Sequence, residues 1–273
     1  MSFYGKTVWI TGASSGIGAA LAREWAGRGA KLILSGRDRT RLQDVAAKLD
    51  TEKLRLPFDV TEEEALAEAT TKATEWQKGG VDIFVANAGI SQRSLAAETD
   101  MKVFREIIEV DLMAQIAATQ ALLPHMLERK SGKLVFISSI AGKVGVPMRT
   151  AYCAAKHGLI GYADALRAEL SVAGIDVHVV APGSVSTNVA RNALEGNGKT
   201  RGRSDKAIDE GIAPDDAAKR IVDAIELNQR EIIVAEGMEE AMGEARRTPD
   251  QLFDQIARLV SDGYAEKMKE GAK

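Results

Sequence analysis

Short apolar runs alternate with longer helical patterns along most of this chain, and this alternation constrains the fold more than any other feature. Runs such as TVWI (7–10) and DVHVVAPG (176–183) are apolar at almost every position, as strands covered on both faces must be. The alternation predicts an α/β fold with a doubly wound parallel sheet of about seven strands and helices on both faces. The other expected strands are 31–36, 54–60, 82–89, 133–139 and 231–235, and the expected helices lie near 16–28, 39–49, 62–78, 100–129, 152–172 and 214–228.

Composition narrows the class of protein. No linker interrupts residues 1–190, so we expect a single domain over 1–273. The net charge is −3, which gives no broad basic field for nucleic acid or an anionic membrane. Cys153 is the only cysteine and the three histidines are scattered, so we expect no disulfide and no metal site. The start lacks the features of a signal peptide, and no apolar run of about 18 residues is present, so we expect a cytoplasmic protein without a membrane span.

Two segments depart from the alternation. The polar stretch EGNGKTRGRSDKAIDEG (195–211) is either a solvated loop or part of a mobile substrate loop, which we place at 188–212, since ligands bind beyond the carboxyl ends of such strands. We expect a helical extension at 238–273. Within it one apolar helix face, expected to dock on its own domain or on a partner subunit, is formed by Leu252, Ile256, Leu259 and Val260.

A glycine-rich turn, TGASSGIG (11–18), lies between the first expected strand and helix. Gly12 permits a tight turn, Gly16 lets the backbone approach a pyrophosphate, and Gly18 allows close packing of helix on strand. The helix N-terminus offers free N–H groups to phosphates. The alternative is a turn without a ligand. The dinucleotide-binding prediction covers Gly12, Ser14, Ser15, Gly16, Ile17 and Gly18.

The end of the second strand bears on the choice of cofactor. A carboxylate there would hold a ribose 2′-hydroxyl, whereas an arginine accommodates a 2′-phosphate. Gly36 stands where the carboxylate is expected, and Arg37 follows, with Arg41 nearby. A guanidinium can grip a phosphate through two hydrogen bonds. Asp38 is a complication because it is also within reach of a ribose, but we predict that NADP(H) is favoured over NAD(H).

Tyr152 and Lys156 lie four residues apart, so a helix places both on one face. They are either packing partners or an acid/base pair, because a nearby cation favours the ionised form of a phenol. Together with TGASSGIG and NAG (87–89), this pair closely resembles the short-chain dehydrogenase/reductase family, in its single-domain, NADP-preferring branch. The resemblance covers roughly residues 5–236 and implies a Rossmann-like fold.

The resemblance implies a role for each matching residue. Tyr152 is the acid/base, Lys156 assists it and binds the nicotinamide ribose, and a serine steadies the substrate oxygen. Ser139 matches the family position, and only one of it and its neighbour Ser138 can face the site. The cofactor contacts implied elsewhere are Asp59 and Val60 beside the adenine, Asn87, Ala88 and Gly89 beside its ribose, and Pro182, Gly183, Val185 and Thr187 beside the nicotinamide.

One position departs from the family pattern. The family usually has an asparagine in the helix after the fourth strand, where its backbone carbonyl takes part in a proton relay. Here the chain reads EVDLMAQ, and Asp111 takes that place. The carboxylate either weakens Lys156 as an activator of Tyr152 or forms an ion pair with it. The neighbouring Cys153 and His157 we interpret as packing or surface residues.

These features favour an NADP-dependent oxidoreductase that interconverts a ketone and a secondary alcohol. Segments such as ALLPHM and SSIAGK resemble members that act on lipid or steroid ketones, which suggests a bulky apolar substrate. The alternatives are a non-catalytic dinucleotide-binding regulatory or scaffold protein and, ranked last, a nucleotide-sugar epimerase or dehydratase. The family also pairs its long helices between subunits, so we expect a homo-dimer or homo-tetramer. Val103, Ile107 and Leu166 belong either to that apolar patch or to the core.

Overall fold

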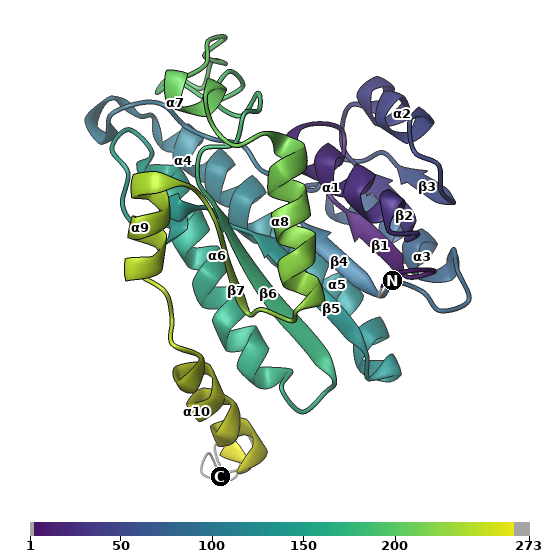
Figure 1. The fold of residues 1–273 in the computed structure, drawn as a ribbon. Coiled ribbons are helices and arrows are strands. Elements are labelled where there is room, and N and C mark those ends of the chain that lie inside the picture. Colours follow the sequence, from purple (N-terminus) through teal and green to yellow (C-terminus); the bar gives the residue numbers. More distant parts are fainter. Residues whose placement is uncertain (1–2, 265–273) are drawn as a thin grey trace.

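The chain folds around a parallel seven-stranded sheet in the order β3-β2-β1-β4-β5-β6-β7 (Figure 1). This computed structural model describes residues 3–264. The sheet confirms the predicted doubly wound fold. The strands are β1 Thr7–Ile10, β2 Lys31–Ser35, β3 Lys53–Leu56, β4 Ile83–Ala86, β5 Gly132–Ile137, β6 Ile175–Pro182 and β7 Glu231–Val234.

Helices cover both faces of the sheet because successive strand residues point to opposite sides. Val8 and Ile10 of β1 pack in one core with α1, α2 and α8, whereas Trp9 between them packs in a second core with α3, α5 and α6. This is why β1 is apolar at successive positions. The helices are α1 Gly16–Gly27, α2 Arg39–Ala47, α3 Glu63–Glu75, α4 Met101–Ile108, α5 Ala114–Arg129, α6 Thr150–Glu169, α7 Lys206–Asp209, α8 Pro214–Glu226, α9 Gly237–Ala245 and α10 Asp250–Ser261.

Two predicted elements differ from the observed ones. The strand expected over 54–60 ends at Leu56, because Pro57 has no N–H to continue the ladder. The helix expected over 100–129 is divided into α4 and α5 by a π-helical turn, η2 Glu109–Met113. Such turns occur frequently at functional sites, and Asp111 lies in this one.

The stretch Met101–Arg129 is long and apolar enough to cross a membrane by length and composition alone. Core helices of soluble proteins meet the same criterion, and α5 packs Ala118, Leu122 and Met126 against the sheet. The expectation of no membrane span therefore stays a prediction. In α4 and α6, Val103, Ile107 and Leu166 are at most 4% exposed, so they belong to the core and form no outer patch.

The carboxyl ends of β1 and β4 lie next to each other, at the point where the strand order reverses. Ligands of doubly wound sheets bind at such a switch point. The segment 188–212 lies over this end of the sheet. It is tied to the chain after β4 by the bridge Gln92↔Leu194 and by the ion pair of Arg93 with Asp205, at 2.7 Å. Its mobility stays a prediction.

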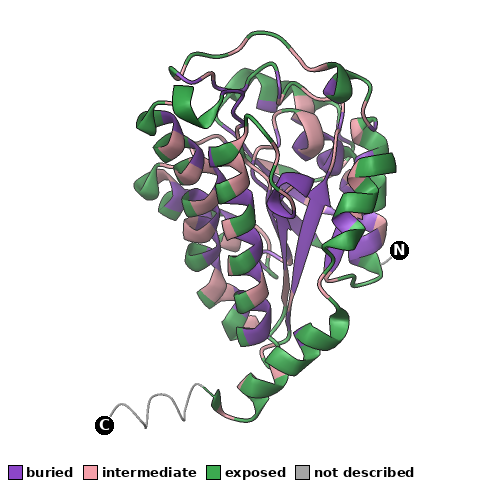
Figure 2. Cartoon of the chain, turned by 90° about the vertical axis from the view of Figure 1, so that its left-hand side faces the viewer, coloured by how far each residue is buried: buried purple, intermediate pink, exposed green. Residues whose placement is uncertain are grey.

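The C-terminal extension forms α9 and α10. Gly243 of α9 fits against Ile140 and Ile233, and Phe253 of α10 is buried against the domain. The predicted apolar face of α10 is largely open: Leu252 and Ile256 are 46% and 43% exposed. Figure 2 shows α10 as a mostly exposed helix at the end of the molecule where the chain terminates. Residues 265–273 of the predicted extension lie outside the described residues.

Candidate active site

The glycine turn joins β1 to α1 and forms a close-fitting cradle. Gly12 and Gly16 have φ angles of +66° and +54°, which favour glycine. A Cβ on Gly12 would lie 2.8 Å from Ala88 Cα, and one on Gly18 would lie 2.3 Å from the Gly12 carbonyl oxygen. Side chains at Gly12 and Gly18 would clash with these atoms, so the glycines let β1, α1 and the end of β4 pack closely at the turn. The first turn of α1 carries no acidic residue and Ser15 does not cap it, which leaves its N–H groups free to bind phosphates.

Asn87 and Thr11 fix this turn to the end of β4. The Asn87 side-chain amide donates to the carbonyl oxygens of Thr11, at 2.9 Å, and Gly12, at 3.3 Å. The Thr11 hydroxyl accepts from the backbone N–H groups of Asn87 and Ala88 and donates to Val85 O. The Asn87 side chain therefore supports the turn, while its backbone lines the cleft.

The end of β2 places an exposed guanidinium at the cleft. Gly36 is buried beside Ser14, and the Arg37 side chain is 65% exposed, 3.5 Å from Asp59 Oδ2. Asp38 is the N-cap of α2, where its carboxylate accepts from Arg41 N at 2.9 Å. This carboxylate is therefore already engaged. Asp59 Oδ1 accepts from the backbone N–H and hydroxyl of Thr61.

Helix α6 carries Tyr152 and Lys156 into the cleft. The Lys156 ammonium lies 5.6 Å from the Tyr152 ring centroid and donates to Ile137 O at 3.1 Å. Ser139, at the end of β5, accepts from Ala141 N and donates to Pro182 O at 3.4 Å. Ser138 is buried, and its hydroxyl donates to Lys156 O at 3.0 Å. Ser139 is only partly buried and lines the cleft, so it is the serine that a substrate can reach.

Asp111 forms the ion pair that was one of the two sequence alternatives. Its side chain is fully buried; Oδ2 lies 3.2 Å from Lys156 Nζ, and Oδ1 accepts from Ile90 N at 2.8 Å. Burial raises the pKa of Asp111, while Lys156 and the Ile90 N–H oppose that rise. Burial also works to lower the pKa of Lys156, but the Asp111 carboxylate and Tyr152 give a net increase. Lys156 therefore stays an ammonium, with part of its charge compensated. A Cβ on Gly89 would crowd this pair, at 3.2 Å from Asp111 Oδ2.

The predicted site residues meet around one cleft of about 590 Å³ at the carboxyl end of the sheet. Among residues 3–264, no three His, Cys, Asp or Glu side chains are placed to hold a metal ion. Cys153 contacts Val146 N through its sulfur, and His157 bonds the Cys153 carbonyl within α6, so both have local roles. The predicted residues that line the cleft are Gly12, Ser14, Ser15, Gly16, Ile17, Gly18, Arg37, Asp59, Val60, Asn87, Ala88, Gly89, Asp111, Ser139, Tyr152, Lys156, Pro182, Gly183, Val185 and Thr187.

Three supporting residues were missed by the sequence analysis. Gln92 Oε1 accepts from Ala151 N at 2.9 Å and so caps the start of α6. Gln115 donates to the carbonyls of Ala88, at 2.6 Å, and Val110, at 3.0 Å, across the π-helical turn. Glu239 of α9 accepts from both the backbone N–H and the hydroxyl of Ser184. The residues joined by these hydrogen bonds are far apart in the sequence or lie at an irregular spacing, so no sequence pattern predicts the contacts.

The sequence of this chain matches a family of known proteins. Residues 6–198 match the family described as short chain dehydrogenase. The chain belongs to the short-chain dehydrogenase/reductase family. It is 39% identical over 239 residues to the dehydrogenase/reductase SDR family member 7B of Danio rerio, covering 84% of this chain and 77% of that protein. It is thus an NAD(P)-dependent oxidoreductase that acts on CH–OH groups.

Solved structures share the fold. Levodione reductase superimposes with a TM-score of 0.78 at 27% identity, covering 88% of this chain and 99% of that one. A Sphingobium yanoikuyae short-chain dehydrogenase in complex with NADPH gives 0.74 at 27% identity, covering 84% and 87%. A Burkholderia phymatum relative in complex with NAD gives 0.75 at 24% identity, covering 85% and 90%. All three structures have the fold of this chain.

Proposed function

We propose that this protein is an NADP-preferring enzyme, one domain over 1–273, that interconverts a ketone and a secondary alcohol. The observation that carries the reaction is the convergence of Ser139, Tyr152 and Lys156 on the cleft that the glycine turn opens into. The glycine cradle and the free N–H groups of α1 would hold the pyrophosphate of the cofactor. Gly183 and Thr187 would border its nicotinamide end.

The bound cofactor supplies or accepts a hydride, and the protein's residues handle the proton. In oxidation Tyr152 removes the proton from the alcohol hydroxyl as the C–H bond breaks; in reduction it returns a proton to the carbonyl oxygen. Ser139 donates a hydrogen bond to that oxygen, where negative charge develops. Lys156, held by Ile137 O and Asp111, keeps an ammonium group beside the Tyr152 ring.

NADP preference is supported by the end of β2. Gly36 presents no carboxylate, the carboxylate of Asp38 caps α2, and Arg37 is exposed at the cleft. An adenosine 2′-phosphate would gain a charge-assisted hydrogen bond from Arg37 and meet no repelling group at Gly36. A bulky apolar substrate is supported by apolar residues that also line the cleft, namely Ile90, Val110, Val189, Leu194 and Ile208.

Two substitutions test the proposal together. A panel of ketones and alcohols, followed by the absorbance of the reduced nicotinamide, first identifies a substrate. Tyr152→Phe should then retain cofactor binding while turnover falls by about 10²–10⁴-fold. Arg37→Ala should weaken NADPH binding about tenfold or more and leave NADH binding nearly unchanged. Full activity of Tyr152→Phe, or equal affinity of the unmodified protein for both cofactors, would contradict the proposal.

A further inference from the structure

Four charged side chains meet where the segment 188–212 reaches the start of α6. The Asp205 carboxylate accepts from Arg93 Nε at 2.7 Å and from Arg201 Nη1, and Arg149 Nη2 lies 3.9 Å from it. The side chains of Arg93, Arg149 and Arg201 are only 6%, 24% and 15% exposed. Three positive charges and one negative charge leave this arginine cluster with a net charge of +2. None of its members lines the catalytic cleft.

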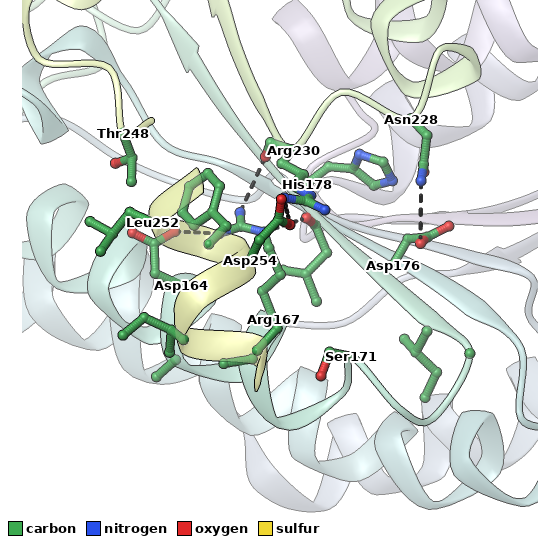
Figure 3. A pocket seen from close by; sticks show the side chains of 18 residues that line it. Asp164, Arg167, Ser171, Asp176, His178, Asn228, Arg230, Thr248, Leu252 and Asp254 are labelled. Atoms are coloured by element: carbon green, nitrogen blue, oxygen red, sulfur yellow. Dashed lines mark hydrogen bonds and ion pairs between the residues drawn. The ribbon is translucent and has the colours of Figure 1, made fainter. Parts of the chain in front are cut away.

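Arg149 has no hydrogen-bonded carboxylate, unlike other arginines in partly buried places. Figure 3 shows two of those beside α10, where Arg167 donates to Asp164 and Arg230 donates to Asp254, both at 2.6 Å. Among residues 3–264 the Arg149 guanidinium donates to no group, and its 3.9 Å distance from Asp205 is too long for a hydrogen bond. A guanidinium this far buried normally has a partner.

The start of α6 adds to the excess of positive charge. Arg149 is the N-cap residue of this helix, and the first turn carries no acidic side chain. The N-terminus of a helix bears a partial positive charge, so a cation is unfavourable there and an anion is favourable. Burial lowers the pKa of Arg93, and the charges of Arg149 and Arg201 add to that lowering against Asp205. One more anion would therefore stabilise the whole arginine cluster.

We propose that the arginine cluster binds a phosphate group, either as the free ion or at the end of a small molecule. The two negative charges of a phosphate match the net charge of +2, and guanidinium groups donate paired hydrogen bonds to its oxygens. The nitrogens of Arg149 and Nη2 of Arg93 have no partner among residues 3–264 and are not fully buried, so a ligand can reach them. The proposal does not depend on the reaction or the cofactor.

The bound group would also connect two parts of the molecule. Arg201 and Asp205 belong to the segment 188–212, whereas Arg93 follows β4 and Arg149 begins α6. A phosphate held by guanidiniums from both sides would fix this segment to the body of the domain. Binding should therefore raise the Tm of the protein, because the folded chain binds the ion and the unfolded chain does not.

The test measures the Tm of the full chain in inorganic phosphate and in chloride, at pH 7.5 and the same ionic strength. With a Kd of about 1 mM, 20 mM phosphate should raise the Tm of the unmodified protein by about 3–5 °C. Arg149→Gln should gain about 2–4 °C less from phosphate. In chloride its Tm should equal or exceed that of the unmodified protein, because the change relieves repulsion at the start of α6. An arginine with a purely structural role would lower the Tm in both salts.

Arg203→Gln is the matched control. Arg203 is exposed on the same segment, so the change removes the same charge and should keep the full gain in Tm. Phosphate bound at the glycine turn would stabilise all variants alike, so the difference between variants reports on the arginine cluster. Phenyl phosphate as a second probe should give an equal gain if the site takes a phosphate group on a larger molecule, and a smaller one if it takes the free ion.

Three results would overturn the proposal. One is no phosphate-dependent gain in the unmodified protein. Another is the same gain in Arg149→Gln as in the unmodified protein. The third is an equal loss of the gain in Arg203→Gln, which would show a general effect of charge and no site.

Discussion

At the scale of single residues, the Asp111–Lys156 ion pair sets this site apart from the family pattern with asparagine. A fully buried carboxylate 3.2 Å from the ammonium compensates part of the positive charge that Tyr152 experiences. The arrangement keeps Lys156 protonated and fixes its position.

Asp111→Asn should therefore move the pH at which alcohol oxidation rises to lower values, by about 0.5–1 pH unit. Asparagine keeps one acceptor oxygen, which can stay with the Ile90 N–H, and removes the negative charge beside Lys156. A pH–rate profile on one accepted alcohol measures the change. Glu109→Gln, at an exposed carboxylate two residues away, is the control and should leave the profile in place. An unmoved profile in Asp111→Asn would mean that Asp111 acts through its backbone alone.

His178 predicts how stability depends on pH. Its pKa falls from 6.5 to about 4 on folding, chiefly through burial, with the cations Lys133 and Arg167 adding to it against Asp176 and the Gln229 carbonyl. Below pH 6.5 His178 becomes protonated in the unfolded chain, whereas in the folded chain it stays neutral down to about pH 4. The stability present above pH 6.5 is therefore lost as the pH falls through this window, by about 2 kcal/mol at pH 5.

The measurement is urea unfolding at pH 7.5 and pH 5. His178→Gln should lose less stability between the two pH values than the unmodified protein, by about 2 kcal/mol. His157→Gln, at an exposed histidine, should lose as much as the unmodified protein. Equal losses in all three proteins would show that the His178 imidazole takes no part.

At the scale of elements, local patterns predicted the sheet because most strands are buried on both faces and the turn after β1 needs glycine at particular positions. The cofactor turn is predicted by Gly12, Gly16 and Gly18, because a larger residue does not fit at these positions. The π-helical turn at Asp111 has no such signal, because it depends on Gln115 joining two carbonyls across the irregular backbone. The hydrogen bonds from Ser184 to Glu239 join residues 55 positions apart, so only the folded chain shows them.

The Glu239–Ser184 hydrogen bonds let α9 support the loop beside the nicotinamide end of the cleft. Glu239 accepts two hydrogen bonds, at 2.6 and 2.9 Å, from Ser184, which follows Gly183. Glu239→Ala leaves both donors unpaired and loosens the loop. We expect KM for the cofactor to rise about fivefold to tenfold, with a smaller change in kcat. Glu240→Ala, at an exposed neighbour on α9, should have the same KM as the unmodified enzyme. A similar rise in KM in that variant would mean that the whole helix, and not the Glu239–Ser184 hydrogen bonds, is responsible.

At the scale of the whole molecule, the family resemblance leads us to expect a homo-dimer or homo-tetramer that pairs its long helices. Gly161 on α6 tests this, because it is exposed and a Cβ there would meet nothing within 4 Å. Glycine has the lowest helix propensity of any residue except proline, and arginine has a high one. A single subunit should therefore tolerate Gly161→Arg or gain stability from it. Across a tightly packed pair of α6 helices, the same arginine would introduce bulk and charge where small residues meet.

Light scattering coupled to gel filtration should therefore show an oligomer for the unmodified protein and dissociation for Gly161→Arg, with an equal or higher Tm at low concentration. Gly27→Arg is the matched control, since Gly27 is also a helical glycine with open space around it, on α1. It should leave the assembly intact, because α1 packs against α8 on the other face of the sheet. A monomeric unmodified protein, or an oligomer that survives Gly161→Arg, would refute pairing through α6. Dissociation of both variants would point to a surface on α1 instead.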